Sequence, residues 1–304
     1  MKIGVVLPLF SGDAERVLAF GRRAEDLGFD GAFAFDHFFP PGASPDRPSL
    51  EPFTMLAAVG ATTSRMEIGT LVTRAQLRPA GLLAKMAVGL DQLTGGRMIL
   101  GVGTGDPIDD PEHRAFGIPP LGKRVRRVHL AETVSAVKAL FRGEVGKGGT
   151  YVPQIEGPLL PGPSRPGGPP VWVGGLADDV VRIAGSIADG WNGWGLDPSA
   201  FRRKASILWQ EAEAAGHGAE ATWAGIVLLG RDETEVATLL EARRARGMTV
   251  DDIWAGTAEG FSAFIGDLEE AGATWVIVVA AGPADRLDML AEMVPRTGDG
   301  PSGG

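Results

Sequence analysis

The chain of 304 residues, of which 44% are hydrophobic and 22% charged, has room for one large domain or two ordinary ones and the composition of a globular protein. Its formal net charge of −9 argues against a nucleic-acid partner, because the densest basic run is the short segment Lys123–Arg127, which we predict to start a helix. The lack of cysteine excludes disulfides and thiolate chemistry, and no apolar run is long enough to span a bilayer, so we expect a cytoplasmic protein without a membrane partner.

Short apolar segments alternate along the chain with longer segments of helical period. The first of them is interrupted by Pro8 and lacks the cleavage site of a signal peptide, so we predict a buried strand there. Eight strands are expected in all, at residues 2–8, 31–35, 66–73, 97–103, 170–175, 190–194, 223–230 and 275–281. Strands that are nearly all apolar and alternate with helices are typical of a parallel sheet covered on both faces. Eight strand–helix units favour an α/β fold of the (β/α)8 TIM-barrel class over an open doubly wound sheet.

Helices and loops fill the segments between these strands. Residues 13–28 and 122–141 carry apolar side chains at helical spacing and are predicted helices. The segment richest in proline and glycine, residues 157–170, is expected to be a loop insertion. Since no segment resembles a linker between two cores, we predict one barrel domain at residues 1–295 and a flexible tail at residues 296–304.

In a TIM barrel the loops that follow the strands build the active site, with loop insertions at the C-terminal face. Asp36 and His37 directly follow the second predicted strand. A positioned histidine is a candidate general acid or base, because its pKa is closest to neutrality, although a capping or solvated side chain is the simpler alternative. The other histidines lie in an expected loop, a helix and a turn, at positions 113, 129 and 217. None of them has metal-ligand spacing, so no metal site is expected.

The segment "GGRMILGVGTGD", Gly95–Asp106, ends the fourth predicted strand in a run of glycines. Its glycines do not fit the GxGxxG dinucleotide pattern, and it lacks the Lys-Ser/Thr ending of a P-loop. A strand end without β-carbons lets a flat ligand approach closely, with Thr104 and Asp106 as hydrogen-bonding groups, although a tight turn explains the glycines equally well. The two glycines at the end of Trp172–Gly175 precede a predicted helix, whose N-terminus could bind a phosphate group. Tight packing of the backbone explains these glycines equally well.

Several motifs together resemble one family. They are "GTLVTRAQLRPAGLLAKMAVGLDQLTGGRMILGVGTGDP", "AFGIPPLGKRVRRVHLAETVSAVKALFRGE", "GGTYV" and "PPVWVGGLADDVVRIAGSIADGWNGWG", which occur in this order with suitable spacing. The chain resembles the luciferase-like monooxygenase superfamily motif by motif from Lys2 to about Gly195, and more loosely to Pro295. The resemblance implies a TIM barrel that binds a flavin, either FMN or the deazaflavin coenzyme F420, at the C-terminal face of its strands.

Within the superfamily, "DHF" at Asp36–Phe38 and "GVGTGD" resemble the coenzyme F420-dependent branch. This resemblance implies His37 as general base and Asp106 as proton donor, where the sugar-phosphate dehydrogenases have glutamate. A side chain shorter by one methylene group weakens the case for that substrate. The resemblance also implies a non-prolyl cis peptide bond at Leu71–Val72. By the same comparison, the coenzyme-binding residues are Asp36, Leu71, Val72, Thr104, Gly105, Val173, Gly174, Gly175 and Leu176.

We therefore expect an oxidoreductase that transfers a hydride between coenzyme F420 and an unidentified small organic substrate. An FMN-dependent monooxygenase and a flavin-binding protein without catalysis are the alternatives. The resemblance alone implies a homodimer. The loops Pro40–Pro48, Pro107–Leu121 and Gly143–Pro170 are expected to form the substrate pocket.

Overall fold

The computed structural model describes residues 1–41, 45–106 and 110–294. Its strands are β1 (Lys2–Val6), β2 (Gly31–Ala34), β3 (Glu67–Thr70), β4 (Thr73–Arg74), β5 (Met98–Gly103), β6 (Val171–Gly174), β7 (Gly190–Trp194), β8 (Glu220–Gly230), β9 (Ile253–Thr257) and β10 (Ala273–Ala281). Its helices are α1 (Ala14–Asp26), α2 (Pro52–Ala61), α3 (Ala80–Leu93), α4 (Asp110–Ala115), α5 (Lys123–Phe141), α6 (Asp178–Ile187), α7 (Pro198–Ala215), α8 (Glu233–Ala245), α9 (Ala258–Glu270) and α10 (Arg286–Ala291). Two short 3₁₀ helices are η1 (Leu9–Ser11) and η2 (Ala75–Leu77).

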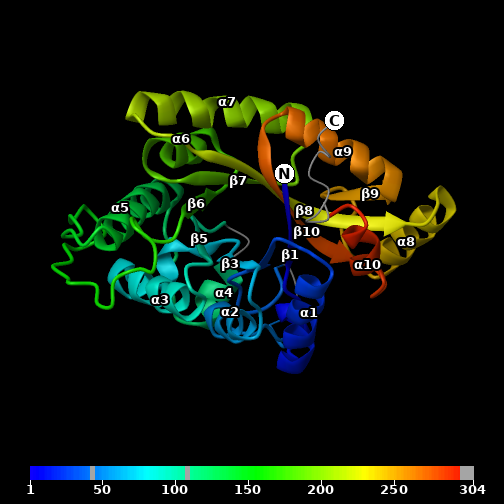
Figure 1. Ribbon diagram of the computed structural model, residues 1–304, viewed down its shortest axis with the longest axis horizontal. Helices are drawn as coiled ribbons and strands as arrows, with labels where there is room; N and C mark the ends of the chain where they lie inside the picture. The colour runs from blue at the N-terminus through cyan, green and yellow to red at the C-terminus, as the bar shows by residue number, and fades with distance from the viewer. Residues whose placement is uncertain (42–44, 107–109, 295–304) are drawn as a thin grey trace, which may run out of the picture.

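The sheet closes into a parallel barrel surrounded by helices (Figure 1). The order β1-β2-β3-β5-β6-β7-β8 is closed by β10, which pairs with both β8 and β1. The predicted TIM barrel is confirmed, because these eight strands correspond to the eight expected from the sequence. One expected strand, residues 66–73, is interrupted, so that β4 continues it after a break at Leu71–Val72 and pairs with β5.

Strand β9 was not expected from the sequence. The edge of β8 that pairs with β7 at Glu220–Ala224 continues beyond β7 and pairs with β9 at Ile226–Gly230. This extension carries α8 outward from the barrel, at the right of Figure 1. All five residues of β9 are only partly buried, so the segment has no continuous buried face that its sequence could have revealed.

Large side chains fill the barrel, and glycines make room for them. The interior cluster consists of Val6, Phe33, Leu71, Ile99, Trp172, Ala224, Trp275 and Ile277. A β-carbon on Gly4 or Gly69 would lie 2.8 Å from the ring of Phe33, so a larger residue there would displace it. Burial of such a side chain contributes about 1.5 to 3 kcal/mol. A second, larger cluster lies between the strands and the helices.

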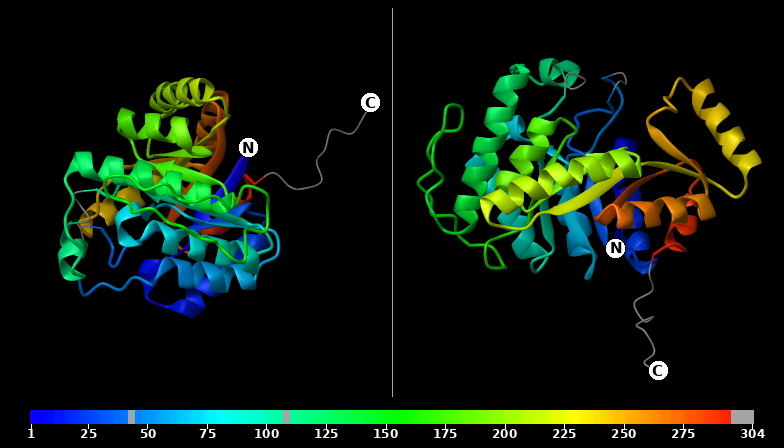
Figure 2. Two further views of the ribbon diagram at one scale, coloured as in Figure 1. Left: turned by 90° about the vertical axis from the view of Figure 1, so that its left-hand side faces the viewer. Right: turned by 90° about the horizontal axis from the view of Figure 1, so that it is seen from above.

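Two of the surrounding helices match the predicted segments closely. Helix α1 is capped by Asp13, whose side chain accepts a hydrogen bond from the backbone N–H of Arg16. Helix α5 starts at Lys123 after Gly122, so the basic run does begin a helix. Figures 1 and 2 show α7 lying along α6 on the outside of the strands.

The proline- and glycine-rich connection after α5 runs along the outside of α3 and α5. Residues 142–170 follow helix α5 and precede β6, so both ends of this loop lie at the amino-terminal side of the strands. Ser164 and Gly162 bond to Asp91 and Gln92 near the end of α3. The middle of the loop reaches further, because Val152 bonds to Glu132 halfway along α5 and Ile155 lies beside the first turn of α3. A contribution of the loop Gly143–Pro170 to the substrate pocket stays a prediction.

The predicted tail at residues 296–304 lies outside the described residues, and the domain boundary at residue 295 stays a prediction. In the described part of the chain, no helix combines the length and apolar character that a membrane span requires.

Candidate active site

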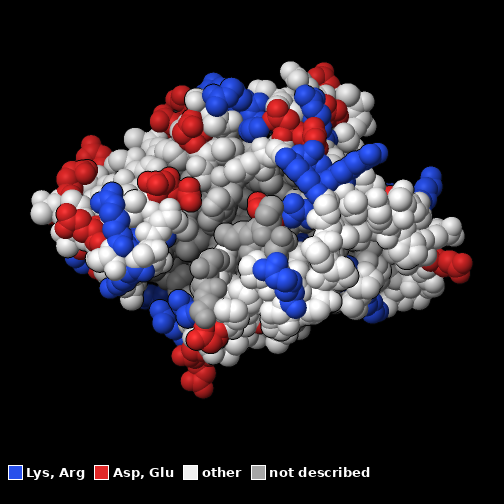
Figure 3. Space-filling view, turned by 180° about the vertical axis from the view of Figure 1, so that it is seen from behind, with Lys and Arg blue, Asp and Glu red and all other residues white. Residues whose placement is uncertain are grey.

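The carboxyl ends of the strands face away from the viewer of Figure 1. The right-hand view of Figure 2 looks at the molecule from above, so that its lower edge is the front of Figure 1, and the N-terminus lies near that edge. Strand β1 therefore begins at the front, and the strands that pair with it are parallel to it. The opposite face, shown in Figure 3, is hollowed near its centre. His37 after β2, Val72 after β3, Thr104 after β5 and Gly175 after β6 all lie on this side of the barrel.

The break between β3 and β4 contains a non-prolyl cis peptide bond at Leu71–Val72, as the resemblance implied. Leu71 is buried in the barrel interior, and Val72 packs on the same cluster. The Val72 side chain occupies space left by glycines of β5 and β6. A β-carbon would lie 2.6 Å from Val72 Cγ2 if added to Gly103, and 2.9 Å from Val72 Cγ1 if added to Gly174. Val72 thus forms an apolar shelf at the top of the barrel.

Asp36, which precedes His37, is held by a buried ionic network. Its side chain is 3% exposed and accepts hydrogen bonds from Thr73 Oγ1 and Arg78 Nη1, both at 2.5 Å. Arg78 also bonds to Glu51 at 2.8 Å. Burial would lower the pKa of Arg78, but the charges and hydrogen bonds of Asp36 and Glu51 raise it above its ordinary value. The network fixes the chain next to His37, and a contact of Asp36 with the coenzyme stays a prediction.

His37 pairs with a carboxylate that the sequence did not single out. Its Nδ1 atom lies 2.7 Å from Oε1 of Glu112, a residue of α4 that is 1% exposed. Oε2 of Glu112 accepts two hydrogen bonds, one from the backbone N–H of Phe38 at 2.7 Å and one from Arg74 Nη2 at 3.0 Å. Burial acts to raise the pKa of Glu112, yet the bonds and charges of His37, Phe38 and Arg74 hold it below its usual range.

Glu112 carries no sequence signal of its own, because it follows Asp109 and Asp110 in a loop-like, acidic stretch. The stretch from Asp110 forms the six-residue helix α4. The next residue, His113, was expected in a loop but lies in α4 and is buried. A short helix packed against the barrel mouth explains both observations.

Two aromatic rings lie close to the imidazole of His37. The centroids of Phe10 and Phe35 each lie 6.3 Å from that of His37, and Phe35 meets Trp194 edge to face at 5.6 Å. Phe35 and Trp194 are partly buried and pack on the interior cluster, as Val72 does. The mouth of the barrel is therefore apolar and aromatic, with His37 at its edge.

The glycine-rich end of β5 turns sharply after Gly103. Gly105 has φ +70°, a conformation that favours glycine, and its carbonyl accepts a hydrogen bond from Thr104 Oγ1 at 2.9 Å. The side chain of Asp106 is exposed. The contacts of Thr104 and Gly105 with the coenzyme, and the role of Asp106 as proton donor, stay predictions.

The end of β6 leads into helix α6. Val173 and Gly174 are buried, Gly175 has φ +147°, and Leu176 is 43% exposed. The helix N-cap is Ala177, which has no side-chain oxygen to bond the first N–H groups.

Two aspartates in the first turn of α6 would oppose an anion there, but each has a basic partner. Asp178 pairs with Lys204, and Asp179 pairs with Arg127 from the basic run of α5. The predicted phosphate site at residues 173–176 is therefore electrostatically balanced and stays a prediction.

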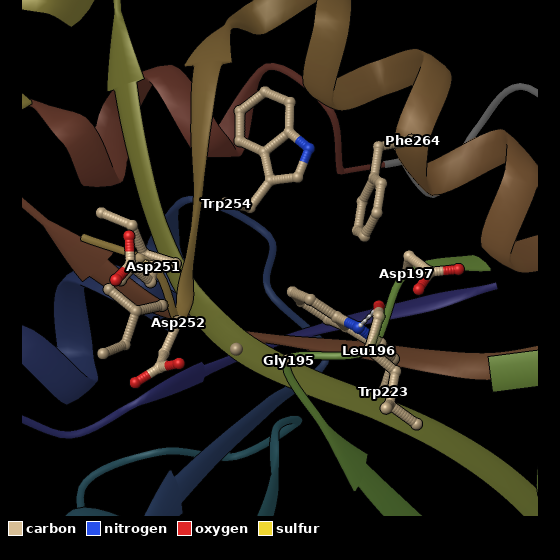
Figure 4. A pocket seen from close by; sticks show the side chains of 11 residues that line it. Gly195, Leu196, Asp197, Trp223, Asp251, Asp252, Trp254 and Phe264 are labelled. Carbon is tan, nitrogen blue, oxygen red and sulfur yellow. Dashed lines mark hydrogen bonds between the residues drawn. The ribbon is translucent and has the colours of Figure 1, made fainter. Parts of the chain in front are cut away.

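A cavity of about 150 Å³ lies elsewhere, between β8, β9 and α9. Figure 4 shows the rings of Trp223, Trp254 and Phe264 around it, with Trp223 Nε1 donating to the Leu196 carbonyl at 2.8 Å. Trp223 packs in the cluster between strands and helices, so this cavity lies outside the barrel and away from His37. Within the part of the chain that the structure describes, no group of three or more metal-ligating side chains occurs.

The fold and the site define a class of protein, a parallel (β/α)8 barrel with a cis-peptide shelf and a histidine at its carboxyl-terminal mouth. The chain belongs to the luciferase-like monooxygenase family, whose model matches residues 1–292.

Curated relatives match part of the chain, with 30% to 35% identity over the aligned residues. An uncharacterized protein of Mycobacterium tuberculosis is 35% identical over 173 residues, which are 56% of this chain and 57% of that protein. A protein of Microbacterium testaceum named F420-dependent glucose-6-phosphate dehydrogenase is 30% identical over 236 residues, which are 75% of this chain and 63% of that protein. The chain thus matches less than two thirds of the length of these relatives.

The fold also matches solved structures. An F420-dependent secondary alcohol dehydrogenase in complex with an F420-acetone adduct superposes with a TM-score of 0.84 at 20% identity, covering 97% of this chain and 98% of that one. This similarity shows that the two proteins share a fold.

Proposed function

We propose that the protein is an oxidoreductase that transfers a hydride between coenzyme F420 and a small organic substrate. The observation that carries the proposal is the Val72 shelf, which lies on glycines of two strands at the barrel mouth where His37 also lies. The F420-dependent dehydrogenases among its relatives support the choice of this coenzyme.

The residues present fit a flat deazaflavin ring. Val72, whose side chain fits over the β-carbon-free backbone of Gly103 and Gly174, offers an apolar floor on which a ring can stack. Residues 173–176 and the uncapped start of α6 would hold the coenzyme phosphate.

The chemistry divides between coenzyme and protein. When bound, the deazaflavin supplies an acceptor or donor of hydride at its C5 atom. His37 accepts the hydroxyl proton as the substrate carbon loses its hydride, or returns it in the opposite direction, so that an alcohol and a carbonyl compound interconvert. The apolar walls exclude water from the reacting carbon, and the fixed position of His37 orients the substrate hydroxyl.

We do not expect glucose 6-phosphate, the substrate in the names of several relatives, to be the substrate of this protein. Two arginines, Arg74 and Arg78, lie near His37, and each is paired with a buried carboxylate, Glu112 or Asp36. A phosphate group needs cationic charge that is not already compensated. The aromatic rings of Phe10, Phe35 and Trp194 suit an uncharged substrate instead.

Purified protein with oxidised coenzyme F420 and a panel of uncharged secondary alcohols tests the proposal. We expect loss of the oxidised coenzyme's absorbance with the wild type and none with His37→Ala, which still binds the coenzyme. Oxygen consumption with reduced FMN, without turnover of F420, would assign an FMN-dependent monooxygenase. Unchanged turnover in His37→Ala would remove His37 from the mechanism.

We also propose that the protein is a homodimer and works in the cytoplasm. The exposed leucines of α3, Leu82 and Leu93, are candidates for the dimer interface. Sedimentation of the wild type and of Leu82→Glu tests the dimer, since a monomeric wild type contradicts it.

A further inference from the structure

The proposed reaction gives no role yet to the buried carboxylate beside His37. We propose that Glu112 is a positioning residue that holds His37 in the tautomer with its proton on Nδ1, so that Nε2 exchanges the proton with the substrate. The catalytic consequence rests on the proposed function, whereas the tautomer is a property of the chain alone.

The two oxygens of Glu112 have different partners. Oε1 faces His37 Nδ1 at 2.7 Å, and Oε2 accepts the backbone N–H of Phe38 at 2.7 Å. The same carboxylate therefore holds the ring of His37 and the backbone of the next residue. The bond to Phe38 fixes the backbone beside His37, and the bond to Nδ1 orients the imidazole toward the carboxylate.

The protonation of the pair follows from the chemistry of its members. Arg74, which is 4% exposed, donates to Oε2 at 3.0 Å and keeps a positive charge beside the carboxylate. The pKa of Glu112 is held below its ordinary value, so the side chain is ionised at neutral pH. An ionised carboxylate only accepts hydrogen bonds. Nδ1 of His37 must then be the donor, and a neutral ring carries its lone pair on Nε2.

The arrangement also prepares the ring for a charge. When His37 takes a proton at Nε2, both ring nitrogens become donors, and the negative Glu112 compensates the new positive charge without any rearrangement. Glu112 lies in the helix after β5 and His37 in the loop after β2, so the contact joins the two connections that frame the barrel mouth. Asp106, the carboxylate that the sequence singled out, is by contrast exposed.

The tautomer is tested by ¹⁵N NMR of histidine-labelled protein without coenzyme. The chain has four histidines, and the variant His37→Gln assigns the signal of His37. We expect the neutral ring of the wild type to carry its proton on Nδ1. Glu112→Gln should populate the other tautomer, because a carboxamide can donate to Nδ1 as well as accept from it. Glu112→Asp, which keeps the charge, should retain the Nδ1–H form in part.

Kinetics supply the second readout. We expect Glu112→Gln to lower kcat about tenfold or more while leaving the Kd for coenzyme F420 unchanged, with partial rescue in Glu112→Asp. Glu132→Gln is the matched control, since Glu132 also accepts backbone N–H groups, those of Thr150, Tyr151 and Val152, but lies on α5 away from His37. It should leave both the tautomer and kcat unchanged.

A wild-type ring with its proton on Nε2 would overturn the inference, and so would a Glu112→Gln variant with the wild-type tautomer and kcat. The wild-type spectrum decides the first point even if Glu112→Gln does not fold. A wild type that neither binds nor turns over coenzyme F420 contradicts the proposed function instead, and leaves the NMR result standing.

Discussion

The side chain of Val72 occupies the space in which Gly103 would carry a β-carbon, since that atom would lie 2.6 Å from Val72 Cγ2. Val72 follows β3 and Gly103 ends β5, which are neighbouring strands in the barrel, so the shelf under the proposed ring depends on their close approach. A methyl group at position 103 must therefore push the shelf upward or distort the strand.

We predict that Gly103→Ala weakens coenzyme binding about tenfold, since such overpacking costs roughly 1 to 3 kcal/mol. Val72→Ala in the same chain removes the clashing atom and should restore most of the affinity, as measured by titration. Gly89→Ala is the control, because a β-carbon there meets nothing within 4 Å, and it should leave binding unchanged. Equal affinities for Gly103→Ala and the wild type would show that the shelf does not carry the ring.

The ion pair between Arg78 and Asp36 yields a prediction about stability. Arg78→Met leaves the carboxylate of Asp36, 3% exposed, without its cationic partner, and breaking a buried pair costs about 3 to 5 kcal/mol. Arg142→Met removes an exposed pair with Glu144 and should cost less than about 1 kcal/mol. Denaturant unfolding compares the two. A similar loss of unfolding free energy in both variants would show that the buried pair of Arg78 and Asp36 stabilises the fold no more than an exposed pair does.

The fold was largely predictable because its strands are apolar runs bounded by glycine or proline. Eight strands and the helices α1 and α5 follow from that pattern, whereas β9, whose residues are all half-buried, does not. Composition also identified the loop Gly143–Pro170, but it does not show which end of the barrel a loop reaches, so its part in the substrate pocket stays a prediction.

The candidate site was predictable only in part. His37 could be found because it follows a strand, and the cis peptide bond at Leu71–Val72 because the family resemblance implied it. Glu112 could not, because its partners His37 and Arg74 are 75 and 38 residues away in sequence. Only the tertiary structure distinguishes it from the neighbouring aspartates.

The pKa of Glu112 leads to a prediction about pH. Because its folded-state pKa lies below the usual 4.5, the ionised carboxylate stabilises the fold above that pH, and this contribution is lost as the pH falls through the folded-state value. The free energy of unfolding of the wild type should exceed that of Glu112→Gln by about 1 to 3 kcal/mol at pH 7. The difference should shrink as the pH falls below 4.5.

Glu213→Gln, on an exposed position of α7, serves as the control and should follow the wild type at every pH. A gap between the wild type and Glu112→Gln that stays constant from neutral to acidic pH would contradict the assignment of an ionised Glu112.

The paired arginines lead to a prediction about substrates. With Arg74 and Arg78 compensated, we expect kcat/KM for glucose 6-phosphate to lie at least about a hundredfold below that for the best uncharged secondary alcohol, a difference of about 2.7 kcal/mol. Steady-state assays with coenzyme F420 measure both values. Efficient turnover of glucose 6-phosphate would show that a cation outside this pair of arginines receives the phosphate.

Binding of the coenzyme itself tests the account most directly. Purified protein is titrated separately with oxidised coenzyme F420 and with FMN, and the two dissociation constants are compared. We predict that coenzyme F420 binds at least about tenfold more tightly than FMN, a preference of about 1.4 kcal/mol. Tight binding of FMN with no measurable binding of coenzyme F420 would contradict the proposed function.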